Sequence, residues 1–402
     1  MSSLEDKLRS LGVKIGTGDL RPVQVARKGH PIEETVPGYD FMTPNGTVYV
    51  VEKSYPLDYL HGNTQLSPSI DLGVLGDWAK ISLEQRLNIP SFCFLDTETS
   101  GLAGGTGTFA FLVGLGGFTP NGFKLTQLFM RDPADESALL TALTHFLAPY
   151  KVVVTYNGKS FDIPLLTTRH ILNGFSSPFP QLGHIDLLHM SRKIWKNRLT
   201  SRRLGDLETD LLQITRTEEE VPGWIIPDLY FEYLRTGDAS RMAGVIYHNG
   251  MDIVSLAALF AFTSNFLAHP AANPESESLD LIAVARLYDE LGRIDEAIEL
   301  YEIALEKGLP LPFYFNALQR YASIFTRQGR FEEAARLWEK AAVLTDPVSC
   351  VELAKHFEHR IKDIGQAIFW TRTAILYPSS IPKVDLIHRL ERLEKKLEQK
   401  RS

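Results

Sequence analysis

Two carboxylates follow a short apolar run in the first quarter of the 402-residue chain. Asp96 and Glu98 come directly after Phe92–Leu95, and side chains two residues apart in a strand point to the same side. Like charges at close range repel each other, and a divalent cation removes that conflict. The pattern predicts a buried strand that delivers two metal ligands. The simpler alternative is a polar strand end with Asp96 as a helix cap.

Two further segments place carboxylates in comparable settings. Asp162 follows a short apolar run at 152–155 and falls in the first turn of a predicted helix. Asp252 lies four residues after His248, so the two share one face of a continuous helix. Taken alone, Asp162 is better explained as a helix cap and His248 as a packed histidine. Their order along the chain is what favours a shared site.

Carboxylates without a cluster of cysteine and histidine are oxygen ligands, which suit Mg²⁺ or Mn²⁺ better than structural zinc. Two such ions about 3.5–4 Å apart activate a water and stabilise the leaving oxygen of a phosphodiester. A nearby histidine or tyrosine orients or deprotonates that water. The predicted chemistry is therefore phosphodiester hydrolysis with two divalent cations.

Alternating strands and helices have to position these residues. Apolar runs predict strands at 92–95, 109–115, 123–129 and 152–155, and helical spacing predicts helices at 136–146 and 160–172. The close spacing of the first three strands, with Asn121-Gly122 as a turn, predicts an antiparallel meander. This order is that of an α/β ribonuclease H-like domain, a mixed sheet flanked by helices. Further helical segments are predicted at 184–212, 228–235 and 240–267.

The chain divides by composition into four predicted parts. Residues 1–88 form an irregular, β-containing lead-in packed on the nuclease domain, with a short amphipathic helix around Leu4. The ribonuclease H-like domain covers 89–267. A linker at 268–278 contains two prolines among small polar residues. Residues 279–402 form an all-α repeat domain that ends in an amphipathic capping helix.

The last part of the chain repeats itself with a period of 37 residues. A third, weaker copy has Lys362 where the glycine should be. Small residues let two helices approach closely, and aromatic residues fill the space between neighbours. The pattern resembles tetratricopeptide repeats, which implies a protein-binding module; a simple brace for the nuclease domain is the alternative. The matching positions are Ala285, Tyr288, Gly292, Ala297, Tyr301, Ala304 and Pro310, followed by Ala322, Phe325, Gly329, Ala334, Trp338, Ala341 and Pro347.

The overall composition is that of an ordinary globular protein, with 44% hydrophobic and 23% charged residues. A net charge of −7 excludes a uniformly basic coat but not a local basic groove. Cys93 and Cys350 lie far apart in apolar contexts, so neither a disulfide framework nor a cysteine-based zinc site is expected. No apolar run is expected to span a membrane. The N-terminus lacks the layout of a signal peptide, and a cytoplasmic protein is expected.

A basic segment offers a surface for phosphates. Six basic residues fall within twelve positions with no acid between them, and Trp195 is interleaved. Phosphate neutralisation and base stacking use such residues, although a solvated helix face is the ordinary explanation of a charge run. The predicted nucleic-acid-binding residues here are Arg192, Lys193, Lys196, Arg198, Arg202 and Arg203.

Three motifs, DTETSGL, YNGKSFDIPLL and YHNGMDIVSL, resemble those of the DEDD (DnaQ-like) superfamily of 3′–5′ exonucleases. Within it, the chain is most similar to the YprB-like ribonuclease H-like family, whose members often carry helical repeats behind the nuclease domain. The resemblance covers about residues 88–265. It implies metal-dependent hydrolysis at single-stranded DNA or RNA 3′ ends, with Asn157 and Phe161 framing the scissile nucleotide; Phe161 could equally be a core residue. The implied metal ligands are Asp96, Glu98, Asp162 and Asp252.

The third motif departs from the family pattern at the general base. The tyrosine subclass has Tyr-x3-Asp, and His248 stands at that tyrosine position; the histidine subclass has His-x4-Asp, and Tyr247 stands at that histidine position. Tyr247 would face Asp252 only if the helix began after Asn249, a good N-cap. His248 is favoured because it needs no helix break and a neutral imidazole is the better base near pH 7.

Three functions are compatible with these motifs. The first is a two-metal 3′–5′ exonuclease acting on single-stranded ends. The second is a structure-selective endonuclease or resolvase on the same fold, because carboxylates determine the reaction but not its polarity. The third is a non-catalytic scaffold whose repeats bind a partner protein, which four retained like charges disfavour.

Overall fold

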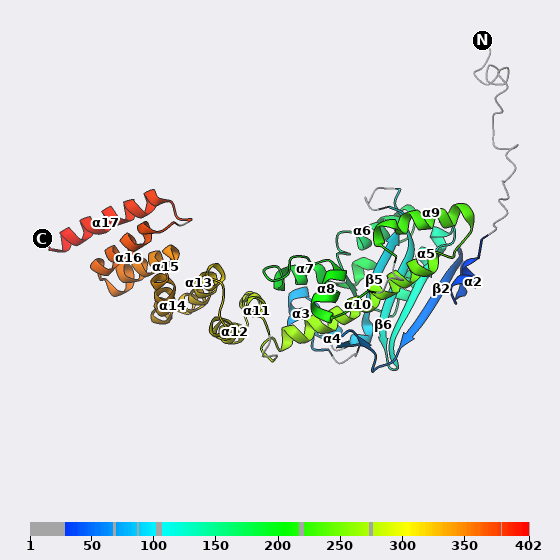
Figure 1. Cartoon of the computed structure of the whole chain (residues 1–402), viewed down its shortest axis with the longest axis horizontal. Coiled ribbons are helices and arrows are strands. Elements are labelled where there is room, and N and C mark those ends of the chain that lie inside the picture. The colour runs from blue at the N-terminus through cyan, green and yellow to red at the C-terminus, as the bar shows by residue number, and fades with distance from the viewer. Residues whose placement is uncertain are drawn as a thin grey trace, which may run out of the picture.

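The computed structural model describes residues 29–66, 70–86, 88–101, 107–216, 221–272, 276–378 and 380–401. An α/β part surrounds one large sheet, and the C-terminal helices form an elongated row that extends away from it (Figure 1). This confirms the predicted fold class, a mixed sheet flanked by helices followed by all-α repeats. The helix predicted around Leu4 lies outside the described residues.

The central sheet has seven strands in the order β1-β2-β7-β6-β5-β8-β9. Strands β5, β6 and β7 form the predicted antiparallel meander, while β8 and β9 run parallel to β5. Parallel neighbours end at the same edge, so the carboxyl ends of β5 and β8 lie together. The strand bounds are β1 Tyr39–Thr43, β2 Gly46–Tyr55, β5 Phe92–Thr99, β6 Ala110–Thr119, β7 Gly122–Phe129, β8 Val152–Thr155 and β9 Gly183–Asp186, with a separate hairpin of β3 Leu60–His61 and β4 Thr64–Gln65.

Strands β1 and β2 come from the N-terminal segment and continue the sheet. β2 pairs antiparallel with β7, with Tyr49 opposite Phe129 and Tyr55 opposite Phe123. This segment therefore extends the sheet as well as covering it. The division of the chain at residue 88, like the other predicted domain boundaries, stays a prediction.

The helical prediction for 184–186 is wrong. Residues Gly183–Asp186 form strand β9, which pairs with β8 along its whole length. The following helix begins only at Leu187, where the Asp186 side chain caps it by accepting a hydrogen bond from the Leu188 amide. A strand of four residues that passes directly into a helix is too short to show its own periodicity.

Helices cover both faces of the sheet, and α10 is the longest of them in the described part of the chain. It crosses β6 where that strand is rich in glycine. A Cβ on Gly114 would come within 2.4 Å of Asn249 Oδ1, and one on Gly116 within 2.6 Å of Ile253 Cγ2. Only glycine permits this close approach. The helices are α2 Ile32–Thr35, α3 Gly73–Ala79, α4 Leu83–Arg86, α5 Glu136–Leu147, α6 Asp162–Leu172, α7 Leu187–Ile194, α8 Leu204–Leu212, α9 Ile226–Thr236 and α10 Met242–Ala268.

Helix α10 also corrects the expectation that no apolar run reaches the length of a membrane span. Its 27 residues include a window with a mean hydropathy of 1.6, long and apolar enough to cross a membrane. However, 67% of that window is buried inside the molecule. The helix is apolar on most sides because it packs between the sheet and its neighbours.

The C-terminal helices confirm the predicted repeats. Ala285, Ala297 and Ala304 are fully buried between paired helices. Gly292 and Gly329 turn the chain with φ values of 77° and 74°, and Lys362 adopts the same left-handed conformation at 66°, as its place in the third copy predicts. The bounds are α11 Ser278–Glu290, α12 Ile294–Lys307, α13 Leu311–Arg327, α14 Phe331–Val343, α15 Pro347–His356, α16 Ile364–Leu376 and α17 Lys383–Arg401.

The first repeat helix is docked on the α/β part. Trp195, Leu267 and Leu281 belong to one hydrophobic core that runs through both parts. The Tyr288 hydroxyl of α11 donates a hydrogen bond to the Leu267 carbonyl near the end of α10. The segment between α10 and α11 therefore joins two surfaces that are in contact.

Candidate metal-dependent nuclease site

The predicted acidic residues gather at the carboxyl edge of β5. Asp96 and Glu98 lie on β5, Asp162 is the first residue of α6, and Asp252 lies on α10. The Thr97 hydroxyl donates a hydrogen bond of 2.5 Å to Asp162 Oδ1, which ties α6 to β5. The four carboxyl groups are close enough that three of them raise the pKa of Asp96.

Burial is the main reason that these groups resist ionisation. Burial and then the nearby carboxylates Asp252 and Asp162 raise the pKa of Glu98 well above its usual range, and the same causes act on Asp96. Burial raises the pKa of Asp162 to about 6, against the opposing hydrogen bond from Thr97. A cluster of this kind favours a divalent cation, because the cation stabilises the charged form of every carboxylate at once.

The donor chemistry fits Mg²⁺ or Mn²⁺, because carboxylate oxygens are the ligands that these ions prefer. Within the described ranges, however, no three histidine, cysteine or acidic side chains converge as a finished metal site. Three of the carboxylates instead have protein partners: Asn249 contacts Asp96, Thr97 contacts Asp162, and Arg216 contacts Asp252. Binding a cation would require these side chains to reorient.

Asn249 contacts Asp96 and is itself held by Gln127, and neither residue was predicted as a site residue. Asn249 is fully buried, and its Nδ2 donates to Asp96 Oδ2 over 2.9 Å. Gln127 on β7 donates to Asn249 Oδ1 at 2.9 Å and to the Ile246 carbonyl at 2.7 Å. The alternative in which the helix begins after Asn249 is wrong, since α10 begins at Met242 and continues past it, as the choice of His248 assumed.

Arg216 and Glu208 form a second, unpredicted part of the cluster. Arg216 Nη2 lies 2.5 Å from Asp252 Oδ1, and its Nε lies 2.5 Å from Glu208 Oε2. Glu208 is 1% exposed. Burial raises the pKa of Asp252, while His248 and Arg216 oppose that rise. Arg216 lies in a loop after α8, where no spacing relates it to the motifs.

The two candidate bases point in different directions. His248 Nε2 lies 3.5 Å from Asp252 Oδ2 and 3.9 Å from Glu98 Oε1, with the side chain 13% exposed. Tyr247 is 37% exposed and lies near Tyr59, outside the carboxylate cluster, where burial and then the Tyr247 phenol raise the pKa of Tyr59. Because α10 is unbroken, His248 faces the cluster and Tyr247 does not.

A buried aspartate that was not predicted shapes the loop before Asp162. Asp186 accepts hydrogen bonds from the amides of Asn157 and Lys159, at 2.8 and 3.0 Å. Asn157 adopts a left-handed conformation with φ of 66°. Phe161 is 57% exposed next to Asp162, so the alternative that it is a core residue is wrong.

The basic segment is only partly available to a ligand. Arg198 forms an ion pair of 2.8 Å with Asp280, and Lys193 one of 2.5 Å with Glu290, both acids on α11. Trp195 is 1% exposed and packs in the core, so the prediction that it stacks on bases is wrong. Four members of the segment remain candidates for phosphate contacts. Arg202 is half-buried, and the other three are exposed: Arg192, Lys196 and Arg203.

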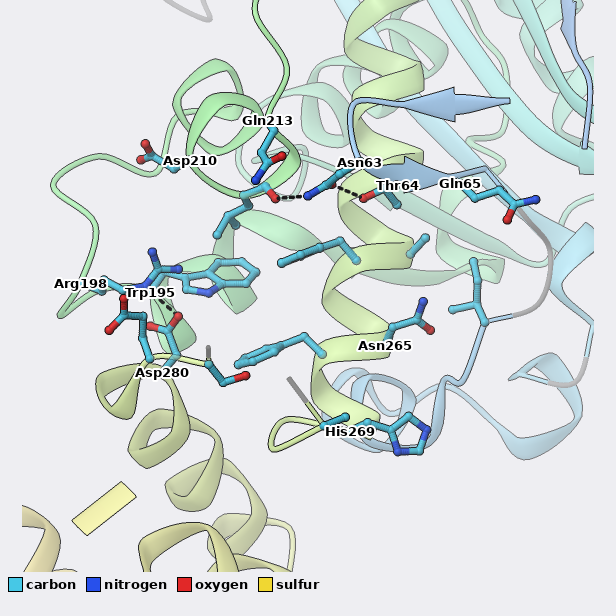
Figure 2. A pocket seen from close by; sticks show the side chains of 18 residues that line it. Asn63, Thr64, Gln65, Trp195, Arg198, Asp210, Gln213, Asn265, His269 and Asp280 are labelled. Carbon is cyan, nitrogen blue, oxygen red and sulfur yellow. Dashed lines mark hydrogen bonds and ion pairs between the residues drawn. The ribbon is translucent and has the colours of Figure 1, made fainter. Parts of the chain in front are cut away.

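A pocket of about 870 Å³ lies away from the carboxylates, between the α/β part and α11. Figure 2 shows Trp195 and Arg198 on one side of it and Asn265 and His269 from α10 and its end on another. Asp280 pairs with Arg198 at its edge. None of the four candidate metal ligands lines it, so it is a cleft between the two parts and separate from the candidate site.

Comparison with known proteins places the α/β part in the RNase_H superfamily, whose model matches residues 93–263. A tetratricopeptide repeat model matches residues 283–348. The chain is 33% identical over 329 residues to the uncharacterized protein YprB of Bacillus subtilis (strain 168), which covers 79% of this chain and 78% of that protein. The chain therefore belongs to the YprB-like family of ribonuclease H-like proteins with C-terminal tetratricopeptide repeats.

A solved structure, the family B DNA polymerase of the hyperthermophilic archaeon Pyrobaculum calidifontis, aligns with 59% of this chain at 13% identity and a TM-score of 0.35. The chain spans only 29% of that polymerase. The superfamily match by itself supports a nucleic-acid-processing function.

Proposed function

We propose that this protein is a metal-dependent 3′–5′ exonuclease that hydrolyses phosphodiester bonds at single-stranded ends of DNA or RNA. One observation carries the proposal: a cluster of four carboxylates, one buried and three half-buried, with His248 placed 3.5 Å from one and 3.9 Å from another. Structural proteins rarely bury like charges together, because each one lacks the solvation it had in water.

The residues of the cluster have distinct proposed roles. Asp96, Glu98, Asp162 and Asp252 would hold two divalent cations, Mg²⁺ or Mn²⁺. Such ions supply an activated water and neutralise the leaving oxygen. His248 Nε2 faces two of the acids and is the proposed acceptor of the proton from water.

Substrate and partner contacts extend the proposal beyond the cluster. Asn157 and Phe161, on the loop before Asp162, would frame the scissile nucleotide. The basic residues of the segment 192–203 other than Lys193 and Arg198 would contact phosphates. The repeats would bind a partner protein. We also propose a cytoplasmic location, which suits the two free, buried cysteines Cys93 and Cys350.

The test is digestion of 5′-labelled single-stranded DNA and RNA with Mg²⁺ or Mn²⁺. We expect stepwise shortening from the 3′ end, loss of activity with chelator, and activity at background in Asp96→Asn. Asp210→Asn, which neutralises an exposed acid outside the cluster, is the matched control and should remain active.

Circular single strands separate the alternatives. An exonuclease leaves circles intact, whereas cutting of circles would indicate an endonuclease or resolvase on the same carboxylates. Undiminished digestion by a folded Asp96→Asn variant would defeat the site assignment. A wild-type protein that neither binds metal nor cuts any substrate would indicate the scaffold.

A further inference from the structure

Trp224 is an exposed tryptophan without a structural explanation. All five tryptophans lie in the described part of the chain, and Trp224 alone is exposed, at 72%. Tryptophan is normally well buried, since its ring is the largest apolar surface of any side chain. Single exposed apolar residues are normal on protein surfaces, so the position of Trp224 relative to the candidate site decides whether it is a candidate ligand contact.

The turn that carries Trp224 borders the carboxylate cluster. Trp224 is the middle residue of a 3₁₀ turn, Gly223–Ile225, directly before α9. A side chain on Gly223 would meet His248 Nε2 at 3.7 Å. The turn is fixed by a 3.0 Å hydrogen bond from the Ile225 amide to the Pro222 carbonyl and by fully buried Ile226. Trp224 therefore directly follows a residue that borders the His248 imidazole, on a turn that these contacts anchor.

A second exposed ring lies at another edge of the same cluster. Phe161 is 57% exposed and directly precedes Asp162. Its loop is held by the hydrogen bonds to Asp186 described above. Two aromatic rings on anchored turns thus flank the four carboxylates, one on the side of α6 and one on the side of α9.

Unpaired bases are the ligands that these two exposed aromatic rings fit best. Four carboxylates repel phosphates, whereas an aromatic ring binds the face of any base without using charge. A protein partner would instead require a contiguous apolar patch. Among the described residues next to Trp224 in the chain, the exposed ones are Pro222, Gly223 and Asp228, which add no further large apolar side chain.

We propose that Trp224 stacks on an unpaired base next to the scissile nucleotide that Phe161 helps to frame. This inference rests on the proposed function and deepens it, since it restricts the substrate to strands whose terminal bases are unpaired and intact. Stacking tolerates every base, so the expected sequence preference is weak.

The test measures binding in the full chain with Asp96→Asn as background, so that substrate persists. Fluorescence anisotropy with labelled single-stranded DNA and RNA should show about 10- to 100-fold weaker binding for Trp224→Ala, the usual size of one lost stacking contact. Trp224→Phe should retain most of the affinity. Phe231→Ala removes another exposed aromatic ring, 48% exposed on α9, and should have little effect.

Two further measurements distinguish stacking from other roles. An oligonucleotide with abasic sites at its 3′ end should bind the parent weakly and should be insensitive to Trp224→Ala. Mn²⁺ binding in otherwise wild-type protein should be unchanged by Trp224→Ala, since Trp224 is not one of the four proposed metal ligands.

Several outcomes would overturn the inference while leaving the proposed function in place. In one, Trp224→Ala binds single strands as tightly as the parent protein. In another, Trp224→Ala weakens binding of intact and abasic strands to the same extent. In the third, Phe231→Ala weakens binding as much as Trp224→Ala does, which would indicate a general apolar surface. If the wild-type chain neither binds nor digests any strand, the proposed function itself fails.

Discussion

At the scale of single residues, Arg216 places a positive charge next to Asp252, one of the four carboxylates that are proposed to bind a metal ion. Its guanidinium contacts Asp252 and the buried Glu208, each at 2.5 Å. The positive charge therefore already offsets one of the four carboxylates before any metal enters. A metal ion that uses Asp252 has to compete with this ion pair.

We predict that removing Arg216 strengthens metal binding. Because Glu208 would otherwise be left as a buried unpaired charge, the variant is the double substitution Arg216→Gln with Glu208→Gln. Mn²⁺ affinity, measured by electron paramagnetic resonance, should increase about tenfold, which is about 1.4 kcal/mol. Arg241→Gln, which breaks an exposed ion pair with Glu232, is the control. Weaker binding in the double variant would mean that Arg216 positions Asp252 for the metal.

The motifs predicted the candidate acids and His248, but not the side chains that hold them. Asp96 and Asp252 stand out because each belongs to a short, unusual run of residues. Asn249 and Gln127 are ordinary residues whose hydrogen bonds join positions 119 to 153 residues apart. One sequence contains no signal for such distant pairings.

At the scale of elements, periodicity identified most strands and helices but missed how they meet. The strand predicted at 109–115 extends to Thr119 as β6, because Gly116 and Gly117 continue it. Glycine weakens strand propensity, so a local pattern ends too early. In the fold these glycines are needed, since Ile253 and Tyr150 pack where their side chains would be.

A buried histidine joins the β3–β4 hairpin to α10. His61 is 4% exposed, and its Nε2 lies 2.7 Å from the Ser255 hydroxyl oxygen. Burial lowers the pKa of His61 from 6.5 to about 4. As the pH falls, His61 therefore binds a proton near pH 6.5 in the unfolded chain but only near pH 4 in the folded protein. The contribution of His61 to the free energy of unfolding is therefore fully present above pH 6.5 and is lost as the pH falls toward 4.

We predict that His61→Gln removes this part of the pH dependence. Between pH 7 and pH 5 the wild type should lose about 2 kcal/mol more of its free energy of unfolding than the variant does. Urea unfolding at both pH values measures the difference, and contributions from other groups cancel between the two proteins. Parallel pH profiles for both proteins would show that His61 does not titrate in this way.

At the scale of the whole molecule, the repeats were predicted from their 37-residue period, but their docking was not. The basic run at 192–203 predicts nucleic-acid contacts, with a solvated helix face as the alternative, because a sequence shows charges without their partners. Lys193 and Arg198 instead form ion pairs with acids on α11, and the Arg198–Asp280 pair lies at the edge of the cleft seen in Figure 2. The same residues thus join the two parts of the protein.

The two ion pairs to α11 should differ sharply in their contribution to docking. Asp280 is 4% exposed, and burial raises its pKa to about 6 despite Arg198. The side chain of Glu290, the partner of Lys193, is 43% exposed. We predict that Arg198→Met costs roughly 3 kcal/mol, because it leaves a buried carboxylate unpaired, and that Lys193→Met costs less than about 1 kcal/mol. Thermal unfolding and the rate of proteolysis within residues 269–277 measure both effects.

A rescue variant tests the physical cause of that difference. If the loss in Arg198→Met comes from the unpaired charge on Asp280, adding Asp280→Asn should restore most of the stability and the resistance to proteolysis, because no buried charge remains. If it comes from lost packing of the arginine side chain, the double variant should be as unstable as Arg198→Met. Equal effects of Arg198→Met and Lys193→Met would contradict the assignment of docking to the buried pair. The α11 contact would then depend on the apolar core around Trp195 and Leu281, and neither ion pair would determine how the repeats sit on the α/β part.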